Sequence, residues 1–545
     1  MRVCTYLALS LCLASTLRPT SADELLPPDR DITTVVDHYV DASLTKAGLS
    51  GNPQANDGTW LRRVTLDLAG RIPTSREYDW FRQQTPDASR KQATVDRLMS
   101  LPDFDFHLRN SLDELLLFNR PYDSGFREYL LWAVKQRRPW DQMFRDMMLA
   151  RYSDGVEKGS SQFLLSRVRE LDDLTNDTAI LFFGVNISCA KCHDHPLVED
   201  WHQDHFYGMQ AFFSRTFATR KNVLSERPFG DVKYKTTEGE EKQASFMFLT
   251  GLVVEDKSPK FEEAERKQLE EQLRKMEQVE DAGYILYPTF SPRHSLVEVA
   301  IKDERERLLA KNIVNRTWNR LLGLGLVDPP DQMHSGNPPS HPELLEWLAR
   351  DLATHAYDLR RLIRGIVLSN AYGRSSEWTS ESEPPAASTF AVIQTKPMTP
   401  RQLSASMLVA VRNPEQWPAD LQSPDWIRHR QDIENQADGW SREFEQPSEQ
   451  FQIAVDEALF FSNGERIQND LLRDSGDRIV GQLKAIEDHA AVTRQLWINV
   501  VNREPTPEEQ AMATDWLART NIERSESIRS LLWALLTGPE FRFNH

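Results

Sequence analysis

One short stretch of the chain holds the residue types with the clearest capacity for chemistry. Residues 185–205 read VNISCAKCHDHPLVEDWHQDH and contain Cys189, Cys192 and His193 in the spacing C-x-x-C-H. This spacing is typical of covalent c-type haem attachment. Positions i and i+3 of a helical turn face the same way, so both thiols can reach the two vinyl groups of one porphyrin, and the next histidine can ligate the iron. We therefore expect one haem c, bound through Cys189 and Cys192, with His193 as proximal ligand.

The residues after the motif supply candidates for the other side of the iron. His202, His205 and Met209 are spaced to share one face of a helix, and each is a candidate distal ligand. The alternative is that they pack and hydrogen-bond around the motif. His195 is too close to His193 to pass over the porphyrin, so we expect it to lie behind the ligand, hydrogen-bonded with Asp194.

Other interpretations of the cysteines compete with haem attachment. Cys189, Cys192, His202 and His205 form a C-x-x-C…H-x-x-H set that zinc or iron could take in a non-haem site, although the separations differ from the usual finger pattern. A thioredoxin-type redox pair would need a βαβ setting, which the sequence does not indicate. A structural disulfide is the third alternative. The histidine directly after Cys192 favours haem, because haem requires it and zinc does not.

The first residues have the pattern of an export signal. Residues 1–22 combine a basic start at Arg2, an apolar run too short to span a bilayer, and small residues before a cleavage site after Ala22. Cleavage would remove Cys4 and Cys12 and leave the motif cysteines as the whole thiol content. Export agrees with haem attachment, which takes place outside the cytoplasm. We expect a periplasmic protein with no membrane span after signal cleavage.

The overall charge restricts the class of partner. The chain has 545 residues, with 65 Lys and Arg against 82 Asp and Glu, a formal charge of −17. Nucleic-acid binders and proteins of anionic membrane surfaces need a basic surface, so neither class is expected. An acidic electron carrier would instead favour a redox partner protein with a basic patch.

Helix signals dominate the rest of the sequence, which predicts a mainly α fold. Four capping boxes mark helix starts, at Thr74–Glu77, Ser340–Glu343, Thr399–Gln402 and Thr506–Glu509. Strand-like runs are scarce, and Phe246–Val254 (FMFLTGLVV) is the clearest, read as one or two short strands. Residues 256–283 are dense in charge and predict a solvated connecting helix.

The length exceeds what one hydrophobic core usually organises, so two helical domains with a small β insertion are expected. The predicted division is a signal peptide over 1–22, a cytochrome-like domain with the C-x-x-C-H motif over 23–255, a charged helical connector over 256–288, and a C-terminal helical domain over 289–545.

A second group of polar residues lies near a predicted turn in the C-terminal domain. Gly323-Leu324-Gly325 lacks the third glycine of a dinucleotide fingerprint and is read as a helix end. Asp331, His334 and His341 follow it and could line a pocket, but a structural loop is favoured. Neither G-x-S-x-G nor H-E-x-x-H occurs, so the sequence identifies no hydrolase machinery.

Several stretches of the chain, taken in order, resemble the exported planctomycete cytochrome C-like proteins, which join a C-x-x-C-H domain to a C-terminal domain of unknown function. The matching stretches are RRVTLDLAGRIPT (62–74), CAKCHDHP (189–196), FYGMQAFF (206–213), NIVNRTWNRLLGLG (312–325), PSHPELLEWLA (339–349), LIRGIVLSNAY (362–372), NREPTPEE (502–509) and LWALLTGPEFRFNH (532–545). The resemblance implies export and haem attachment, and it implies no settled reaction. Members with an additional N-terminal haem-binding domain are common, whereas we expect this chain to correspond to the second domain onward.

Two functional classes follow. In the first, the chain is an exported c-type-haem protein of periplasmic electron transfer, as a carrier or as a subunit of an oxidoreductase system. In the second, the cysteine–histidine cluster holds zinc or iron in a structural or binding protein without a redox role. The sequence identifies no catalytic residue and so does not decide whether the chain is an enzyme.

Overall fold

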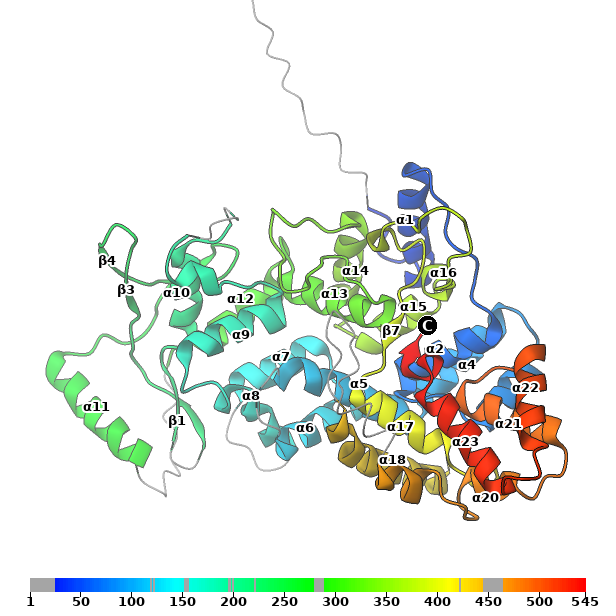
Figure 1. The fold of residues 1–545 in the computed structure, drawn as a ribbon. Coiled ribbons are helices and arrows are strands. Elements are labelled where there is room, and N and C mark those ends of the chain that lie inside the picture. Colours follow the sequence, from blue (N-terminus) through cyan, green and yellow to red (C-terminus); the bar gives the residue numbers. More distant parts are fainter. Residues whose placement is uncertain are drawn as a thin grey trace, which may run out of the picture.

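The computed structural model describes residues 25–117, 120, 123–150, 156–194, 198, 200–219, 222–278, 289–420, 423–444 and 464–545. The predicted signal peptide, residues 1–22, lies outside these residues. The described chain is mainly α-helical with short two-stranded sheets, which confirms the predicted fold class (Figure 1). In this part of the chain, every helix is too short or too polar to cross a membrane.

The first part of the chain is a run of helices that pack on one another. They are α1 (Ile32–Lys46), α2 (Asp57–Ala69), α3 (Ser75–Gln83), α4 (Ala88–Ser100), α5 (Pro102–Leu117), α6 (Ser124–Lys135), α7 (Trp140–Leu149), α8 (Gln162–Leu165), α9 (Leu171–Phe183) and α10 (Gln203–Phe213), with the 3₁₀ turns η1 (Val156–Ser161) and η2 (Ser188–Lys191).

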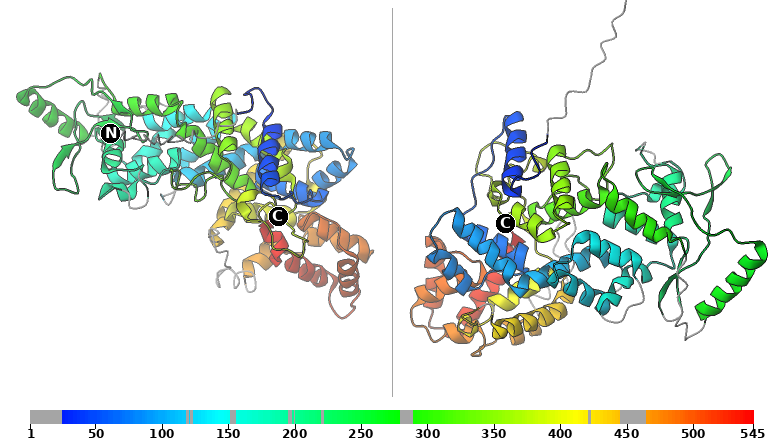
Figure 2. Two further views of the ribbon diagram at one scale, coloured as in Figure 1. Left: turned by 90° about the horizontal axis from the view of Figure 1, so that it is seen from above. Right: turned by 180° about the vertical axis from the view of Figure 1, so that it is seen from behind.

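Short antiparallel hairpins follow α10, where the sequence predicts a β insertion. The pairs are β1 (Thr216–Ala218) with β2 (Leu224–Glu226), β3 (Lys233–Lys235) with β4 (Glu241–Gln243), and β5 (Phe246–Met247) with β6 (Val253–Val254). The last pair, in the register Phe246 to Val254, confirms the strands expected in the FMFLTGLVV run. The charged helix α11 (Glu263–Gln278) is almost wholly exposed and projects from one end of the elongated molecule (Figures 1 and 2).

The second part is again helical. It comprises α12 (Pro292–Lys302), α13 (Leu308–Leu322), α14 (Pro342–Thr354), α15 (Leu359–Val367), α16 (Asn370–Gly373), α17 (Pro400–Ala410), α18 (Pro424–Trp440), α20 (Ile479–Leu483), α21 (His489–Val500), α22 (Pro507–Leu517), α23 (Arg524–Thr537) and α24 (Pro539–Arg542), with the short turns η3 (Ala387–Thr389), η4 (Pro414–Gln416), η5 (Ser441–Glu443) and η6 (Ile467–Leu471). The strand β7 (Lys396–Pro397) pairs with β8 (Phe543–Asn544) and so draws the chain end back to the middle of the molecule.

The capping signals account for most of the helix starts that the sequence predicts. Reciprocal capping boxes are present at Thr74, Thr399 and Thr506. The box predicted at Ser340 is wrong. The hydroxyl of Ser340 donates to the carbonyl of Leu326 at 3.2 Å, and α14 begins at Pro342, with His341 as its N-cap residue and no side-chain cap. The capping-box pattern assigns this hydroxyl to the helix end, but it bonds to the carbonyl of Leu326 instead.

Helices from the two parts of the chain share one buried hydrophobic cluster, which includes residues from Ile32 to Phe541. Helix α1 packs on α14, α15 and α16, α9 packs on α13, and α7 and α10 both pack on α12. Two fully buried arginines of α2 add hydrogen bonds between the two parts of the chain. Arg62 donates to the side chain of Asn502 (2.8 Å) and the carbonyl of Phe541 (2.8 Å), and Arg63 to the carbonyl of Tyr372 (2.6 Å). Helix α2 therefore anchors both parts of the chain.

Candidate functional site

The C-x-x-C-H motif follows the end of helix α9. That helix ends at Gly184, whose left-handed φ of 70° turns the chain away. The side chain of Asn186 then accepts from the backbone N–H of Ser188 at 3.1 Å and opens the 3₁₀ turn η2. The N–H of Cys192 donates to the carbonyl of Cys189 at 3.3 Å, which closes the turn between the two cysteines. The predicted helical turn at the motif is thus a single 3₁₀ turn.

Both motif thiols are available. Cys189 and Cys192 are free and exposed, so no disulfide joins them in this structure. His193 is exposed, and its Nδ1 lies 2.8 Å from the carbonyl oxygen of Asp194. An imidazole that donates from Nδ1 to a carbonyl keeps Nε2 as its free lone pair, which is the arrangement of a metal-ligating histidine. The residues of the motif therefore fit a covalently attached haem.

Helix α10 and the start of α9 hold the backbone of the turn. The amide of Gln203 donates to the carbonyl of Cys192 at 3.3 Å, and the hydroxyl of Tyr207 donates to the carbonyl of Lys191 at 3.0 Å. Lys191 also pairs with Asp172 at 2.5 Å. The ring of Tyr207 stacks on Tyr234, with centroids 4.1 Å apart. The turn is thus fixed through its carbonyls, which leaves the thiols unengaged.

Asp194 organises the residues after the motif. Its carboxylate accepts from the backbone N–H of Gln203 at 3.1 Å and lies 3.3 Å from Nδ1 of His202. The N–H of Gln203 is the main reason that the pKa of Asp194 is lowered. Its predicted partner His195 lies outside the described residues.

The three candidate distal ligands have different surroundings. The backbone N–H of His202 donates to Nδ1 of His205 at 3.2 Å, so these two residues are together at the start of α10. Burial lowers the pKa of His205, which favours a neutral ring. Met209 is fully buried in the hydrophobic cluster. His205 is two positions from Gln203 and from Tyr207, about 200° around the helix, so it faces away from the turn that those two residues hold. A distal-ligand role for any of the three stays a prediction.

The alternative metal set is not assembled in the described structure. Among the described residues, no group of three or more His, Cys, Asp and Glu side chains could hold a metal ion. Cys189, Cys192, His202 and His205 therefore do not form one ligand cluster.

His205 instead faces a cavity of about 640 Å³ between α10 and the loop before α14, lined also by Trp201, Met333 and His334. The loop is fixed against the residues that precede the motif, because the N–H of Asn186 donates to the carbonyl of Asp331 at 2.9 Å. Of the polar residues that the sequence singles out here, His334 lines the cavity. His341 is buried, which lowers its pKa to about 4. The helix end expected at Gly323 is confirmed.

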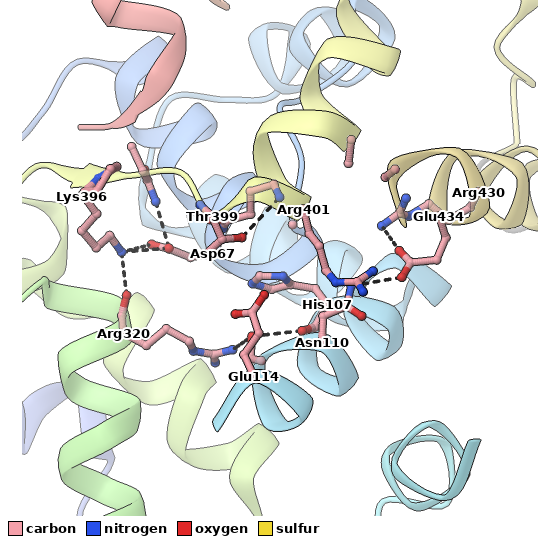
Figure 3. Close-up of a pocket in the computed structure, with 17 residues that line it drawn as sticks. Asp67, His107, Asn110, Glu114, Arg320, Lys396, Thr399, Arg401, Arg430 and Glu434 are labelled. Atoms are coloured by element: carbon pink, nitrogen blue, oxygen red, sulfur yellow. Dashed lines mark hydrogen bonds and ion pairs between the residues drawn. The ribbon is translucent and has the colours of Figure 1, made fainter. Parts of the chain in front are cut away.

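A second polar centre is one that the sequence reasoning missed. Side chains from α2, α5, α13, α17 and α18 enclose a charged cavity of about 190 Å³ (Figure 3). Its charged and titratable lining residues are Asp67, His107, Glu114, Arg320, Lys396, Arg401, Arg430 and Glu434. They are spread over most of the chain, so no local spacing could reveal them.

Comparisons with known proteins match two consecutive regions of this chain. Residues 35–218 match the family model PSCyt2, described as a protein of unknown function (DUF1549). Residues 292–517 match the model PSD1, described as a protein of unknown function (DUF1553). No curated protein and no solved structure matches the chain. Two regions of the chain are therefore similar, in this order, to PSCyt2 and PSD1, and both family models are of unknown function.

Proposed function

We propose that this chain is an exported, periplasmic protein that carries one haem c on Cys189 and Cys192 and acts in electron transfer, as a carrier or as a subunit of an oxidoreductase system. The observation that carries the proposal is the geometry of the motif. Two free, exposed thiols close one 3₁₀ turn, and the adjacent His193 has its Nδ1 next to a carbonyl, with Nε2 left for a metal.

The chain's own residues would then have separate tasks. Cys189 and Cys192 would hold the haem covalently, and His193 would be the iron ligand. The carbonyl of Asp194 fixes the ring orientation of His193, while Gln203 and Tyr207 keep the turn in place. Bound in this way, a haem supplies one-electron redox chemistry, whose potential depends on ligand, burial and nearby hydrogen bonds.

The experiment is production of the full chain in a host with haem-attachment machinery. We expect a Soret band, and an intact mass that still includes haem after acid extraction. Cys192→Ala should abolish or strongly reduce attachment, whereas Ser188→Ala, in the same turn, should retain it. Colourless wild-type protein with stoichiometric zinc would contradict haem binding. N-terminal sequencing should show cleavage after Ala22, and a retained leader on a cytoplasmic product would contradict export.

The acidic charge of the chain supports a redox partner with a basic patch. Reduction of the haem protein by that partner should slow as ionic strength rises, because salt screens exposed charges. Stopped-flow absorbance measures the rate, and a rate that is indifferent to salt would contradict charge steering.

A further inference from the structure

The charged cavity lies among helices that are not part of the C-x-x-C-H site. Polar side chains complete its walls between the charged ones, and Asn110, Ser111, Thr399, Gln402 and Asn544 are among them. Figure 3 shows Asp67 and Lys396 on one side, Arg430 and Glu434 on the other, and His107 and Glu114 between them. The cavity is polar enough, and large enough, to hold a small hydrophilic molecule.

Most charges around this cavity already have partners. Lys396 donates to Asp67 at 2.8 Å and to the carbonyls of Arg320 and Leu321, in the last turn of α13. These bonds make Lys396 a fixed part of the wall.

The opposite wall is held in the same manner. Arg430 pairs with Asp103 (3.2 Å) and Glu434 (3.4 Å), and Arg401 pairs with Asp438 at 2.5 Å. Still, Nη1 of Arg401 and Nη1 of Arg430 are buried without a hydrogen-bond acceptor among the described residues. Buried donors of this kind are normally satisfied, so they indicate a missing acceptor in or next to the cavity.

Arg320 and Glu114 differ from the other charged residues. Within the described chain neither forms an ion pair, and the guanidinium of Arg320 donates to the hydroxyl of Ser111 at 2.8 Å. Both side chains also line a second cavity of about 380 Å³, which has a more apolar wall that includes Leu108, Leu112 and Ile313. Arg320 and Glu114 therefore lie where the two cavities adjoin.

We propose that the charged cavity binds a small hydroxycarboxylate, with its carboxylate on Arg320 and its hydroxyl groups on the amide and hydroxyl side chains of the wall. The guanidinium of Arg320 matches the planar, two-oxygen geometry of a carboxylate. A single uncompensated cation suits a monoanion, whereas a dianion such as sulfate would bring a second negative charge next to Glu114. The amides of Asn110 and Gln402 already use their oxygens and one N–H each, so each can offer its second N–H to a hydroxylated molecule.

Glu114 makes this binding sensitive to pH. Desolvation by the surrounding walls raises the pKa of Glu114 to about 7, although part of its side chain is open to solvent. As a neutral acid it donates a hydrogen bond to the bound carboxylate, and as an anion it repels that carboxylate. The cations Arg401, Arg127 and Arg320 favour the anion of Glu114, and Asp113 favours the acid. Glu434, Lys396 and Arg430 also line the cavity, and burial lowers the pKa of His107, which lies beside Glu114. Affinity should therefore fall as pH rises through about 7.

Isothermal titration of the purified full chain with glycolate, L-lactate and D-gluconate tests the proposal. Sorbitol is the neutral counterpart of gluconate, propane-1,2-diol that of lactate and ethylene glycol that of glycolate, and sulfate is the dianion control. At least one carboxylate should bind and its neutral counterpart should not. Binding of none of the three carboxylates, or equal binding of sulfate, would overturn the proposal.

Two variants and one control locate the site. Arg320→Gln should weaken carboxylate binding about ten- to hundredfold, the range of a lost charge-assisted contact. Arg428→Gln removes the same charge from an exposed position on α18 and should leave the affinity unchanged. Glu114→Gln should bind the carboxylate with nearly the same affinity at about pH 6 and about pH 8. The affinity of the wild type should fall between these two pH values. Equal affinities for the wild type and Arg320→Gln, at unchanged melting temperature, would place the ligand elsewhere. The Cys192→Ala protein should still bind, so failure of haem attachment and failure of this site are distinguishable.

Discussion

Arg71 is a buried cation held between two buried carboxylates. Its Nε lies 2.6 Å from Asp103 and its Nη1 lies 2.7 Å from Glu77. The guanidinium lowers the pKa of Glu77, although burial alone would raise it. Removing one member of such a group leaves uncompensated charge in the interior, which is far more costly than losing an exposed pair.

We expect Arg71→Met to lower the free energy of unfolding by about 3–5 kcal/mol, because Glu77 then loses its cation and Asp103 one of its two. Urea denaturation measures the change. Arg428→Met breaks the exposed pair with Asp425 and should cost less than about 1 kcal/mol. Similar losses in the two variants would contradict the role assigned to burial.

The capping box of helix α22 is coupled to a neighbouring cation. Glu509 accepts the backbone N–H of Thr506 at 2.8 Å and pairs with Arg503 at 2.7 Å. Arg503 is the main cause that lowers the pKa of Glu509 from 4.5 to about 2. A carboxyl whose pKa is lower in the folded chain stabilises it above the unfolded pKa, and this stabilisation is lost as pH falls through the folded pKa.

Glu509→Gln should therefore cost about 1–3 kcal/mol of unfolding free energy at neutral pH, after allowance for partial exposure. The difference from wild type should shrink between about pH 4.5 and about pH 2. Urea midpoints over this range provide the measurement, with the exposed neighbour Glu508→Gln as control. A pH-independent difference would show that the lost charge is not the cause.

Two helices can pack closely where one of them has a glycine at the contact, as α15 does against α1. A Cβ added at Gly365 of α15 would lie 2.4 Å from Cβ of Ile32, the first residue of α1. At Gly439, in the last turn of α18, the same Cβ would meet no atom within 4 Å.

Gly365→Ala should destabilise the protein by about 1–3 kcal/mol, because two packed helices must move apart. Gly439→Ala should stabilise it by about 0.5–1 kcal/mol, since alanine restricts the unfolded chain and favours the helix. Thermal and urea unfolding compare both with wild type. Stabilisation by both substitutions would contradict the close approach of α1 and α15.

At the scale of the whole molecule, the hydrophobic cluster runs through both parts of the chain. Arg62 and Arg63 carry their charges into the interior, and most of their acceptors belong to residues after 370. The two matched regions therefore share buried contacts that neither could complete alone.

We expect the mature chain to unfold in one cooperative transition that tryptophan fluorescence and far-UV circular dichroism report at the same denaturant concentration. Residues 23–255 expressed alone should lack such a transition, because Arg62 and Arg63 would lose their acceptors. A fragment that unfolds cooperatively, or two separate transitions in the full chain, would instead support the two independent domains that the chain length predicts.

The sequence by itself determined those features that depend on residues a few positions apart. Three capping boxes, the Phe246–Val254 hairpin, the charged helix after it and the helix end at Gly323 are specified by residues a few positions apart, and the structure confirms them. The motif at Cys189 was found in the same way, because its spacing is itself the signal.

Tertiary structure alone decided which distant residues meet. The charged cavity joins Asp67 to Asn544, and helical periodicity shows which face of a helix is buried without showing what lies opposite. The same limit explains the wrong capping box at Ser340, whose hydroxyl bonds a carbonyl fourteen positions earlier. It also explains His205, which shares a predicted helix face with Met209 but lines a cavity formed with the loop before α14. Contacts within one helical turn are determined by the spacing of residues in the sequence, whereas contacts between helices depend on the packing of the whole core.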